Sequence, residues 1–358
     1  MFESLRRQDW LLTGAFLILA VASLTVLASV NIRLFWIQGA WFLLGLFFIL
    51  SIGRFDLKPL LAYRWTVPSV YLGSAAFLLL TLFFAPVTRH ARSWLVVGPF
   101  RFQPAELAKV ALILLLAYFF AKRHVHIAHL STLAKSFLYW AIPAGLILFQ
   151  PDWGSAMVVT AIWIGFLLVS GMRWRHLAIG FFLFAITAFL SWHFVLAPYQ
   201  KERIVGFLNP AYDPLGINYS VSQAKIAIGS GGFFGKGFRQ GTQTQLGYLT
   251  ESSTDFIFAA LAEEWGFFGI LVVSAGFFLL LFRIVRVGLR SEEGFSQFVC
   301  LGTAILFLTE FTLNVGSNLG LSPVVGVTFP FLSYGGSSLL TKALLLGIIQ
   351  SIARASLF

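Results

Sequence analysis

Long apolar stretches alternate with short polar segments along the whole chain. The stretches cover residues 10–30, 34–52, 66–85, 104–121, 136–150, 154–170, 176–197, 255–283, 297–317 and 337–354. A helix needs about 20 apolar residues to cross the roughly 30 Å hydrocarbon core of a bilayer. The pattern therefore predicts an all-α integral membrane protein with about ten transmembrane helices.

The fifth and sixth stretches are short and are separated only by residues 151–153. Such a pair is also compatible with a re-entrant hairpin. Two full spans are preferred because they place the positive charges better. With the N-terminus inside, 14 of the 25 Lys and Arg residues fall in inside segments, nine in outside segments and two within spans. Five of the nine outside charges lie in a loop of more than 50 residues, where the positive-inside rule counts little.

This topology places both termini in the cytoplasm and makes residues 1–358 a single polytopic membrane domain. Residues 198–254 then form a large extracytoplasmic loop between spans seven and eight. Apolar and aromatic residues run through this loop, so an ordered, functional loop is favoured over a disordered one. The first apolar stretch has no small-residue cleavage site behind it and is expected to remain as an anchor.

Composition excludes several classes of protein. Hydrophobic residues make up 58% of the chain and charged residues only 11%, so a soluble enzyme, a disordered chain and a collagen-like fibre are ruled out. The single cysteine, Cys300, excludes an internal disulfide framework and a multi-cysteine metal site. The net charge of +11 follows the loops and so does not indicate a nucleic-acid-binding protein.

Ionisable residues inside the spans point to function, because charge at hydrocarbon depth usually faces a cavity or a partner. Glu106 and Lys109 stand at i, i+3 on one face of the fourth span. They are either an ion pair that locks a helix or a paired site beneath a substrate pocket. The ninth span carries Glu310, and residues 323–338 then interrupt the hydrophobic pattern with Pro, Gly and Ser.

Irregular backbone at membrane depth is tolerated only against protein or a wet cavity. The sequence therefore predicts a broken re-entrant segment near the C-terminus. It also predicts a polar cavity that opens to the outside, lined by Glu106, Lys109, Asp255 and this segment.

Asp255 stands where the large loop enters the eighth span. Ser252 and Asp255 match a capping box, in which the carboxylate only stabilises the start of a helix. Capping and catalysis are equally compatible with this pattern. Glu263 and Glu264 follow within the same predicted span and need partners or water.

Three further segments carry candidate chemistry. Arg101 lies at the outer interface, where lipid phosphates are found, although basic and aromatic residues there often only anchor a span. Asp152 is expected to cap the sixth helix. The glycine-rich run at 229–237 ends near Lys236 and is a weak phosphate signal, because it lacks the ending and strand context of a nucleotide P-loop.

Five motifs in this order resemble the SEDS family (shape, elongation, division and sporulation) of bacterial cell-wall proteins. They are QPAELAK at 103–109, QPDWGS at 150–155, GGFFGKG at 231–237, TDFIFA at 254–259 with Glu263 and Glu264, and PFLSYGGSS at 330–338. The departures are small: Thr250 replaces a usual proline, Ser253 a usual histidine, and Trp153 and Ser155 a usual Leu and Thr. The elongation branch of the family is favoured over the division branch because both termini are short and Ala262 precedes the paired glutamates.

The resemblance implies a ten-span peptidoglycan glycosyltransferase of the bacterial inner membrane. Such an enzyme polymerises lipid II at the outer face, releases undecaprenyl diphosphate and pairs with a class B penicillin-binding protein. Asp255 would be the general base that deprotonates the acceptor hydroxyl. The expected substrate-binding residues are Trp94, Arg101, Glu106, Lys109, Gln200, Arg203, Lys236 and Arg239. No cofactor is evident, although a divalent cation could help to hold the diphosphate.

Two other classes of function are alternatives. A lipid II flippase also needs a polar cavity within a many-span bundle, but here the ionisable groups gather near one face and no paired charges cross the bilayer. A non-catalytic scaffold of the elongation machinery would give no reason for polar groups at hydrocarbon depth.

Overall fold

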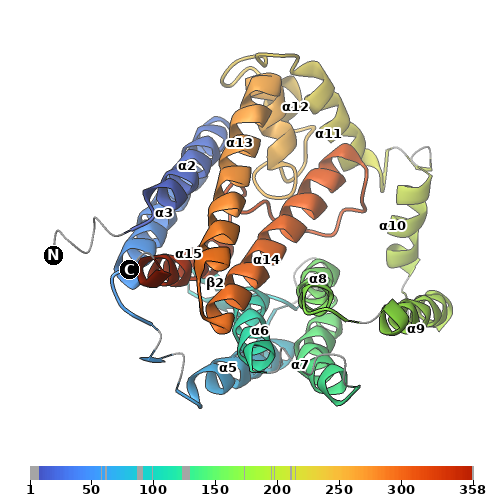
Figure 1. The fold of residues 1–358 in the computed structure, drawn as a ribbon. Helices are drawn as coiled ribbons and strands as arrows, with labels where there is room; N and C mark the ends of the chain where they lie inside the picture. The colour runs from blue at the N-terminus through green and yellow to red at the C-terminus, as the bar shows by residue number, and fades with distance from the viewer. Residues whose placement is uncertain are drawn as a thin grey trace.

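The computed structural model describes residues 8–57, 59–60, 63–86, 92–98, 100–122, 130–172, 174–194, 196, 198–209, 212–213 and 215–356 (Figure 1). Ten long helices occupy the predicted stretches and identify a multi-pass membrane protein. They are α2 (Trp10–Val30), α3 (Ile32–Ile52), α5 (Thr66–Phe84), α6 (Pro104–Ala121), α7 (Leu130–Phe149), α8 (Trp153–Val169), α9 (Trp174–Phe194), α13 (Ile257–Arg290), α14 (Gly294–Leu319) and α15 (Gly336–Ser356). Within the described residues, nine of these are long and apolar enough to span, and α8 is shorter, at 17 residues.

The remaining elements are short. A hairpin of β1 (Leu95–Val97) and β2 (Phe100–Phe102) precedes α6, and Val96 faces Arg101 in its antiparallel register. The segment predicted as the large loop contains α10 (Pro198–Leu208), α11 (Tyr219–Ser230) and α12 (Thr242–Gln245). The hairpin leads directly into α6, because β2 ends at Phe102 and α6 begins at Pro104.

Polar side chains set the ends of several helices. Asp9 caps α2 by accepting a hydrogen bond from the backbone N–H of Leu12 at 3.1 Å. Asp152 caps α8 in the same way, with the N–H of Ser155 at 3.0 Å, so its predicted capping role is confirmed. Pro104 occupies the first turn of α6, where no backbone N–H is needed.

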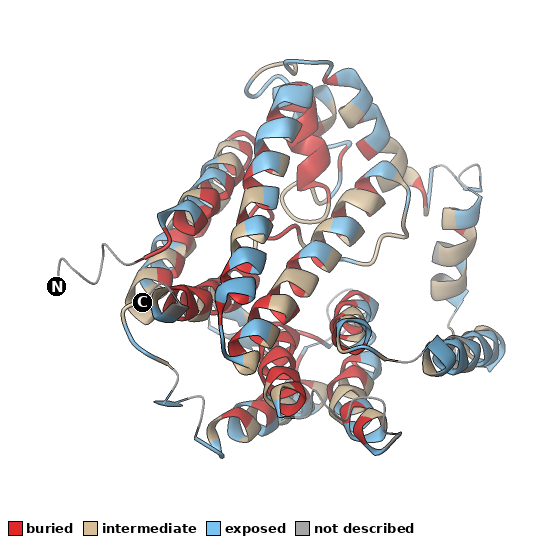
Figure 2. Cartoon of the chain, in the orientation of Figure 1, coloured by how far each residue is buried: buried red, intermediate tan, exposed pale blue. Residues whose placement is uncertain are grey.

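The core of the bundle lies along α6 and α15. In each of these helices 83% of the apolar window is buried inside the protein, and both are largely buried in Figure 2. By contrast, α9 has none of its apolar window buried and lies with α10 at the edge of the bundle (Figure 1). An apolar helix with an exposed surface of this kind is what faces lipid in a membrane protein.

The first and last spans are joined at one end of the bundle. The N–H of Asp9 donates to the side-chain oxygen of Gln350 at 2.8 Å, and the Gln350 amide donates back to the Asp9 carbonyl at 2.9 Å. Arg283 at the lower part of α13 adds an ion pair to the Asp9 carboxylate. Both ends of the polytopic chain therefore lie on the same side of the bundle, as an even number of spans requires.

Residues 320–335, between α14 and α15, form the predicted broken segment. The Ser23 hydroxyl, near the middle of α2, donates to the carbonyl of Leu332 at 2.7 Å. The Gln38 side chain of α3 both donates to Ser333 O, at 3.3 Å, and accepts from Gly335 N, at 3.2 Å. Side chains of two spans thus satisfy this irregular backbone at membrane depth.

The eighth span differs from its prediction as one straight helix. Gly266 has φ 62° and ψ −161°, which divides α13 into a short part, 257–265, buried except for Trp265, and a long part, 267–290. The glycine-rich run fills the bend: Phe267 N donates to Gly232 O, and Gly237 N donates to Glu264 O. A side chain at position 266 would collide with this run, since an added Cβ would lie 2.3 Å from Gly235 N. The apolar pattern cannot reveal this break, because both parts of the helix are apolar.

Candidate active site

Four charged side chains form a buried ion network between α6, α14 and α15. The Lys109 ammonium lies 2.9 Å from Glu106 Oε1 and 2.8 Å from Glu310 Oε1. The other Glu310 oxygen, Oε2, lies 2.7 Å from the Lys342 ammonium. The relative exposure of these four residues does not exceed 5%. Two positive and two negative charges make the network neutral, which is what permits it at this depth.

This arrangement corrects one expectation and extends another. Glu106 and Lys109 do pair, but they do not line an open polar cavity, because Glu310 completes the coordination of the ammonium and packing encloses it. Lys342 is a member that sequence reasoning missed. The signal was present as a second lysine inside a span with no acidic residue at i±3 or i±4 on its own helix.

Lys342 connects the network to the broken segment. Its ammonium donates to the hydroxyl of Ser338 and, at 3.4 Å, to that of Thr328. These two hydroxyls lie 3.2 Å apart. Lys342 therefore links the ion network to both ends of residues 328–338.

The Asp255 turn is fixed by two asparagines of α14. The carbonyl of Asp255 accepts from Asn314 Nδ2 at 3.1 Å and from Asn318 Nδ2 at 2.8 Å. Asn318 Oδ1 also accepts from the N–H of Ala259, in the first turn of α13, at 3.1 Å. The same turn is tied to the broken segment, since Ser333 Oγ donates to Thr254 O at 2.7 Å.

The predicted capping box at Ser252 and Asp255 is not formed. The helix begins at Ile257, its N-cap is Phe256, and Glu251 to Phe256 are turn residues. The cap is supplied instead by Asn318 from another helix, a contact that local sequence cannot reveal. Asp255 is partly exposed, in contrast to the buried residues 256–264 that follow it.

The ion network and the Asp255 turn share one face of α14. Glu310, Asn314 and Asn318 are spaced by four residues, so they lie along the same side of the helix, each about 6 Å from the next. The Asp255 backbone is therefore placed roughly one to two helical turns from the paired lysines. A substrate at Asp255 would sit at the end of this polar row.

The hairpin residues lie near the same region. Arg101 is exposed on β2, and Trp94, immediately before β1, is partly exposed. The hairpin leads through Gln103 into α6, and Gln103 donates to Asp152 at 2.8 Å. Strand β2 also packs against α15, the helix that carries Lys342. Arg101 therefore lies on a strand that packs against α15 and leads into α6.

Two other predicted cations, Lys236 and Arg239, have structural partners. The Lys236 ammonium pairs with the buried Glu263 carboxylate at 2.9 Å, and Lys236 N donates to Glu263 O. Glu263 additionally accepts from the N–H groups of Gln243 and Thr244 at the start of α12. Arg239 donates to the carbonyl of Ala28 at the end of α2 at 3.0 Å. The glycine-rich run thus packs against α12 and α13, and the amides of Lys236 and Gly237 bond to the backbone of α13 and not to a phosphate.

Glu264 finds its own partners at the end of α2. Its Oε1 accepts from the hydroxyl of Ser29 and from Gln245 at 3.1 Å. Ser29 is the penultimate residue of α2, at the end opposite to Asp9. The pair of glutamates therefore lies beside the bend at Gly266, at the end of the bundle opposite to Asp9, and not in the middle of a straight span.

Two predicted residues lie apart from this region. Gln200 is on α10, at the edge of the bundle (Figure 1), and the side chain of Arg203 falls outside the described residues. Within the described part of the chain, no group of three or more His, Cys, Asp or Glu side chains is arranged to hold a metal ion.

The fold and the polar row define a polytopic membrane protein with a buried ion network and an irregular segment between its last two spans. Comparison with known proteins places it further: the FtsW/RodA/SpoVE family, described as "Cell cycle protein", matches residues 6–357. The chain belongs to this family. The resemblance inferred from the five sequence motifs is thereby confirmed.

Three similar proteins illustrate the relationship. The Escherichia coli (strain K12) protein named peptidoglycan glycosyltransferase MrdB is 37% identical over 294 residues, 82% of this chain and 79% of that protein. A structure described as structural coordination of polymerization and crosslinking by a peptidoglycan synthase complex matches with a TM-score of 0.84 and 31% identity, over 98% of both chains. The crystal structure of the Thermus thermophilus rod shape determining protein RodA matches with a TM-score of 0.73 and 29% identity, over 97% of both chains.

Proposed function

We propose that this protein is a peptidoglycan glycosyltransferase that links lipid II disaccharides into β-1,4 glycan strands at the outer face of the cytoplasmic membrane. Family membership and the name of the E. coli relative support the reaction. Likeness to a rod shape determining protein supports a role in cell elongation. The topology that accompanies the proposal has both termini in the cytoplasm, and the 198–254 region outside.

Asp255 is the proposed general base. The donor sugar is α-linked to the lipid diphosphate and the product is β-linked, so the reaction is one inverting displacement at C1. A base must remove the proton of the acceptor 4-hydroxyl as the new bond forms. The observation that carries this role is the fixing of the Asp255 backbone by Asn314 and Asn318, while the residue itself stays partly exposed. Such fixing holds a base in place with little reorganisation during the reaction.

The leaving diphosphate needs positive charge beside it. Arg101 is the best placed of the exposed cations, because β2 packs on α15 and leads directly into α6. Lys109 is buried and held by Glu106 and Glu310. Its proposed contribution is therefore to orient α6, α14 and α15 around the site. Trp94 and Gln200 would contact the sugar or lipid portions of the substrate, and Arg203, Lys236 and Arg239 would provide further charge along the outer region.

The proposed partner is a class B penicillin-binding protein, which would cross-link the strands that this chain makes. The similarity to a chain of a peptidoglycan synthase complex, extending over 98% of both chains, supports this pairing. A divalent cation is the proposed aid for the diphosphate if the protein cations do not suffice.

The direct test is polymerisation by the purified full chain with its penicillin-binding partner, lipid II as substrate and gel separation of the glycans. Asp255→Asn should reduce the rate by about 10²- to 10⁴-fold, because general-base assistance is lost. Asp56→Asn, an exposed carboxylate outside the site, serves as the matched control and should give wild-type ladders. Equal ladders from wild type and Asp255→Asn would refute the assigned base. If neither gave a ladder while labelled lipid II crossed liposomes, the flippase interpretation would replace the polymerase.

A further inference from the structure

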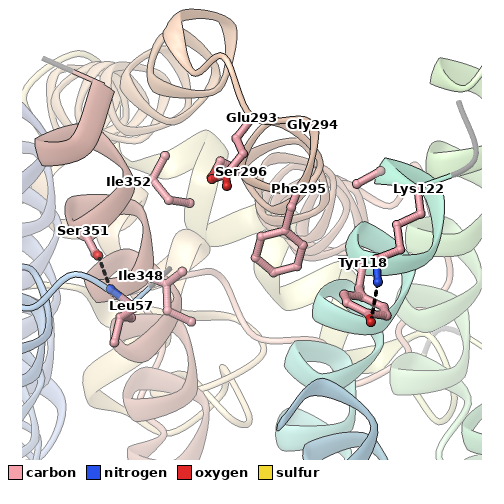
Figure 3. A pocket seen from close by; sticks show the side chains of 11 residues that line it. Leu57, Tyr118, Lys122, Glu293, Gly294, Phe295, Ser296, Ile348, Ser351 and Ile352 are labelled. Carbon is pink, nitrogen blue, oxygen red and sulfur yellow. Dashed lines mark hydrogen bonds between the residues drawn. The ribbon is translucent and has the colours of Figure 1, made fainter. Parts of the chain in front are cut away.

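Two cavities lie at the end of the bundle where Asp9 meets Gln350. The first, of about 290 Å³, is enclosed by the end of α6, the start of α14 and the last turns of α15 (Figure 3). The second, of about 380 Å³, lies between α5, α6 and α7. Tyr118 and Lys122 line both cavities and separate them. Neither cavity takes part in the proposed reaction, because the ion network and the Asp255 turn lie further along the bundle.

The walls of these cavities are mostly apolar and carry a few charged side chains. Phe295, Ile348 and Ile352 line the first cavity, and Leu115 and Leu138 line the second. Their basic residues are Lys122, shared by both, and Lys135 in the second. Among the described lining residues, Glu293 is the one carboxylate. It accepts a hydrogen bond from Ser296 at 3.2 Å, across the first cavity from Lys122 in Figure 3.

The Lys122 side chain is held in place between the cavities. Its ammonium lies 2.5 Å from the Tyr118 hydroxyl and 3.9 Å from the centre of the same ring. Gly294, in the first turn of α14, lines the first cavity, so the positive end of that helix also points toward it. An exposed, oriented ammonium over apolar walls matches a ligand with a negative head and a hydrocarbon body.

We propose that an anionic phospholipid binds here, with its phosphate between Lys122 and Lys135 and its acyl chains along the apolar walls. Basic pockets between transmembrane helices at the cytoplasmic side hold the headgroups of anionic lipids, and each lysine near such a surface contributes about 1 kcal/mol. Under the proposed topology this end faces the cytoplasm. It is also the end where Arg286, Arg290 and Arg354 gather near the ends of α13 and α15.

Native mass spectrometry of the purified full chain tests the proposal, with phosphatidylglycerol or phosphatidylcholine of the same acyl chains as probes. Phosphatidylglycerol should bind at lower concentration than phosphatidylcholine. The Lys122→Gln/Lys135→Gln variant should bind it roughly 30-fold more weakly, the effect of two lysines. Arg290→Gln removes a positive charge from the same end without touching either cavity, and should bind phosphatidylglycerol like the wild type.

Three outcomes would overturn the proposal: unchanged binding by the double variant, an equal loss in Arg290→Gln, or displacement of the lipid by inorganic phosphate. The last would assign the lysines to a soluble anion. If Lys122→Gln disturbs Tyr118 and the fold, Lys135→Gln alone carries the test, with an expected loss of about fivefold. The measurement involves no glycosyl transfer, so its result is independent of the proposed enzymatic function.

Discussion

Removing one member of the buried ion network should destabilise the protein far more than removing a matched pair. In Lys342→Met, Glu310 keeps its contact with Lys109, but the enclosed group of four acquires a net charge of −1. Loss of one partner from a buried pair costs about 3–5 kcal/mol, because the remaining charge stays desolvated. At roughly 2 °C per kcal/mol, the apparent melting temperature should fall by about 6–10 °C.

The double variant Glu310→Gln/Lys342→Met should recover much of this loss. It leaves Glu106 and Lys109 as a balanced pair at 2.9 Å and removes the other two charges together. Neutral or apolar replacement of a whole buried pair is often close to neutral in stability. We therefore expect a coupling energy of about 2–3 kcal/mol between the two positions.

The assay is thermal unfolding of the detergent-purified full chain, followed by size-exclusion chromatography after heating. Wild type, both single variants and the double variant are compared at one protein concentration and one salt concentration. Melting temperatures that fall additively in the double variant would refute the charge-balance argument. An unchanged melting temperature in Lys342→Met would show that water solvates the remaining charge, and would refute the argument from burial of the network.

Two further predictions concern the backbone around the site. Asn318→Ala should reduce polymerisation at least tenfold while retaining a folded chain, because it removes the shorter of the two hydrogen bonds to the Asp255 carbonyl and the acceptor for the N–H of Ala259. Thr312→Ala, on the exposed side of α14, is the control, and equal activity of the two variants would contradict the fixing role. Gly266→Ala should lower the apparent melting temperature by several degrees, since φ 62° with ψ −161° is open essentially only to glycine. Gly73→Ala, in a helix with nothing within 4 Å of an added Cβ, should be neutral or slightly stabilising, and similar melting of these two glycine variants would contradict the strain argument.

The sequence predicts the spans well because each needs only a local property, an apolar run of sufficient length. All ten predicted stretches carry a helix, and the cap at Asp152 forms as its local pattern indicates. The broken segment is also readable, because Pro, Gly and Ser interrupt the apolar pattern between residues 323 and 338. These features depend on neighbours in the chain.

The site depends on contacts between distant segments, and there the sequence is less informative. Glu106 pairs with Lys109 at i, i+3, as predicted, but Glu310 joins them from 201 residues away. The capping box considered for Ser252 and Asp255 does not form, and Asn318 on another helix accepts the hydrogen bond from the first turn of α13. A partner on a separate helix has no periodic signature, so neither contact could be derived from spacing alone.

The reciprocal hydrogen bonds between Asp9 and Gln350 connect positions 341 residues apart. At a synthesis rate of about 5–20 residues per second, the start of the first helix waits roughly 17–70 s for this partner to leave the ribosome. During that interval the first helix is already in the bilayer, and Asp9 lacks the hydrogen bonds that Gln350 later provides. Closure of the bundle is consequently a late event of biogenesis, because it requires residue 350.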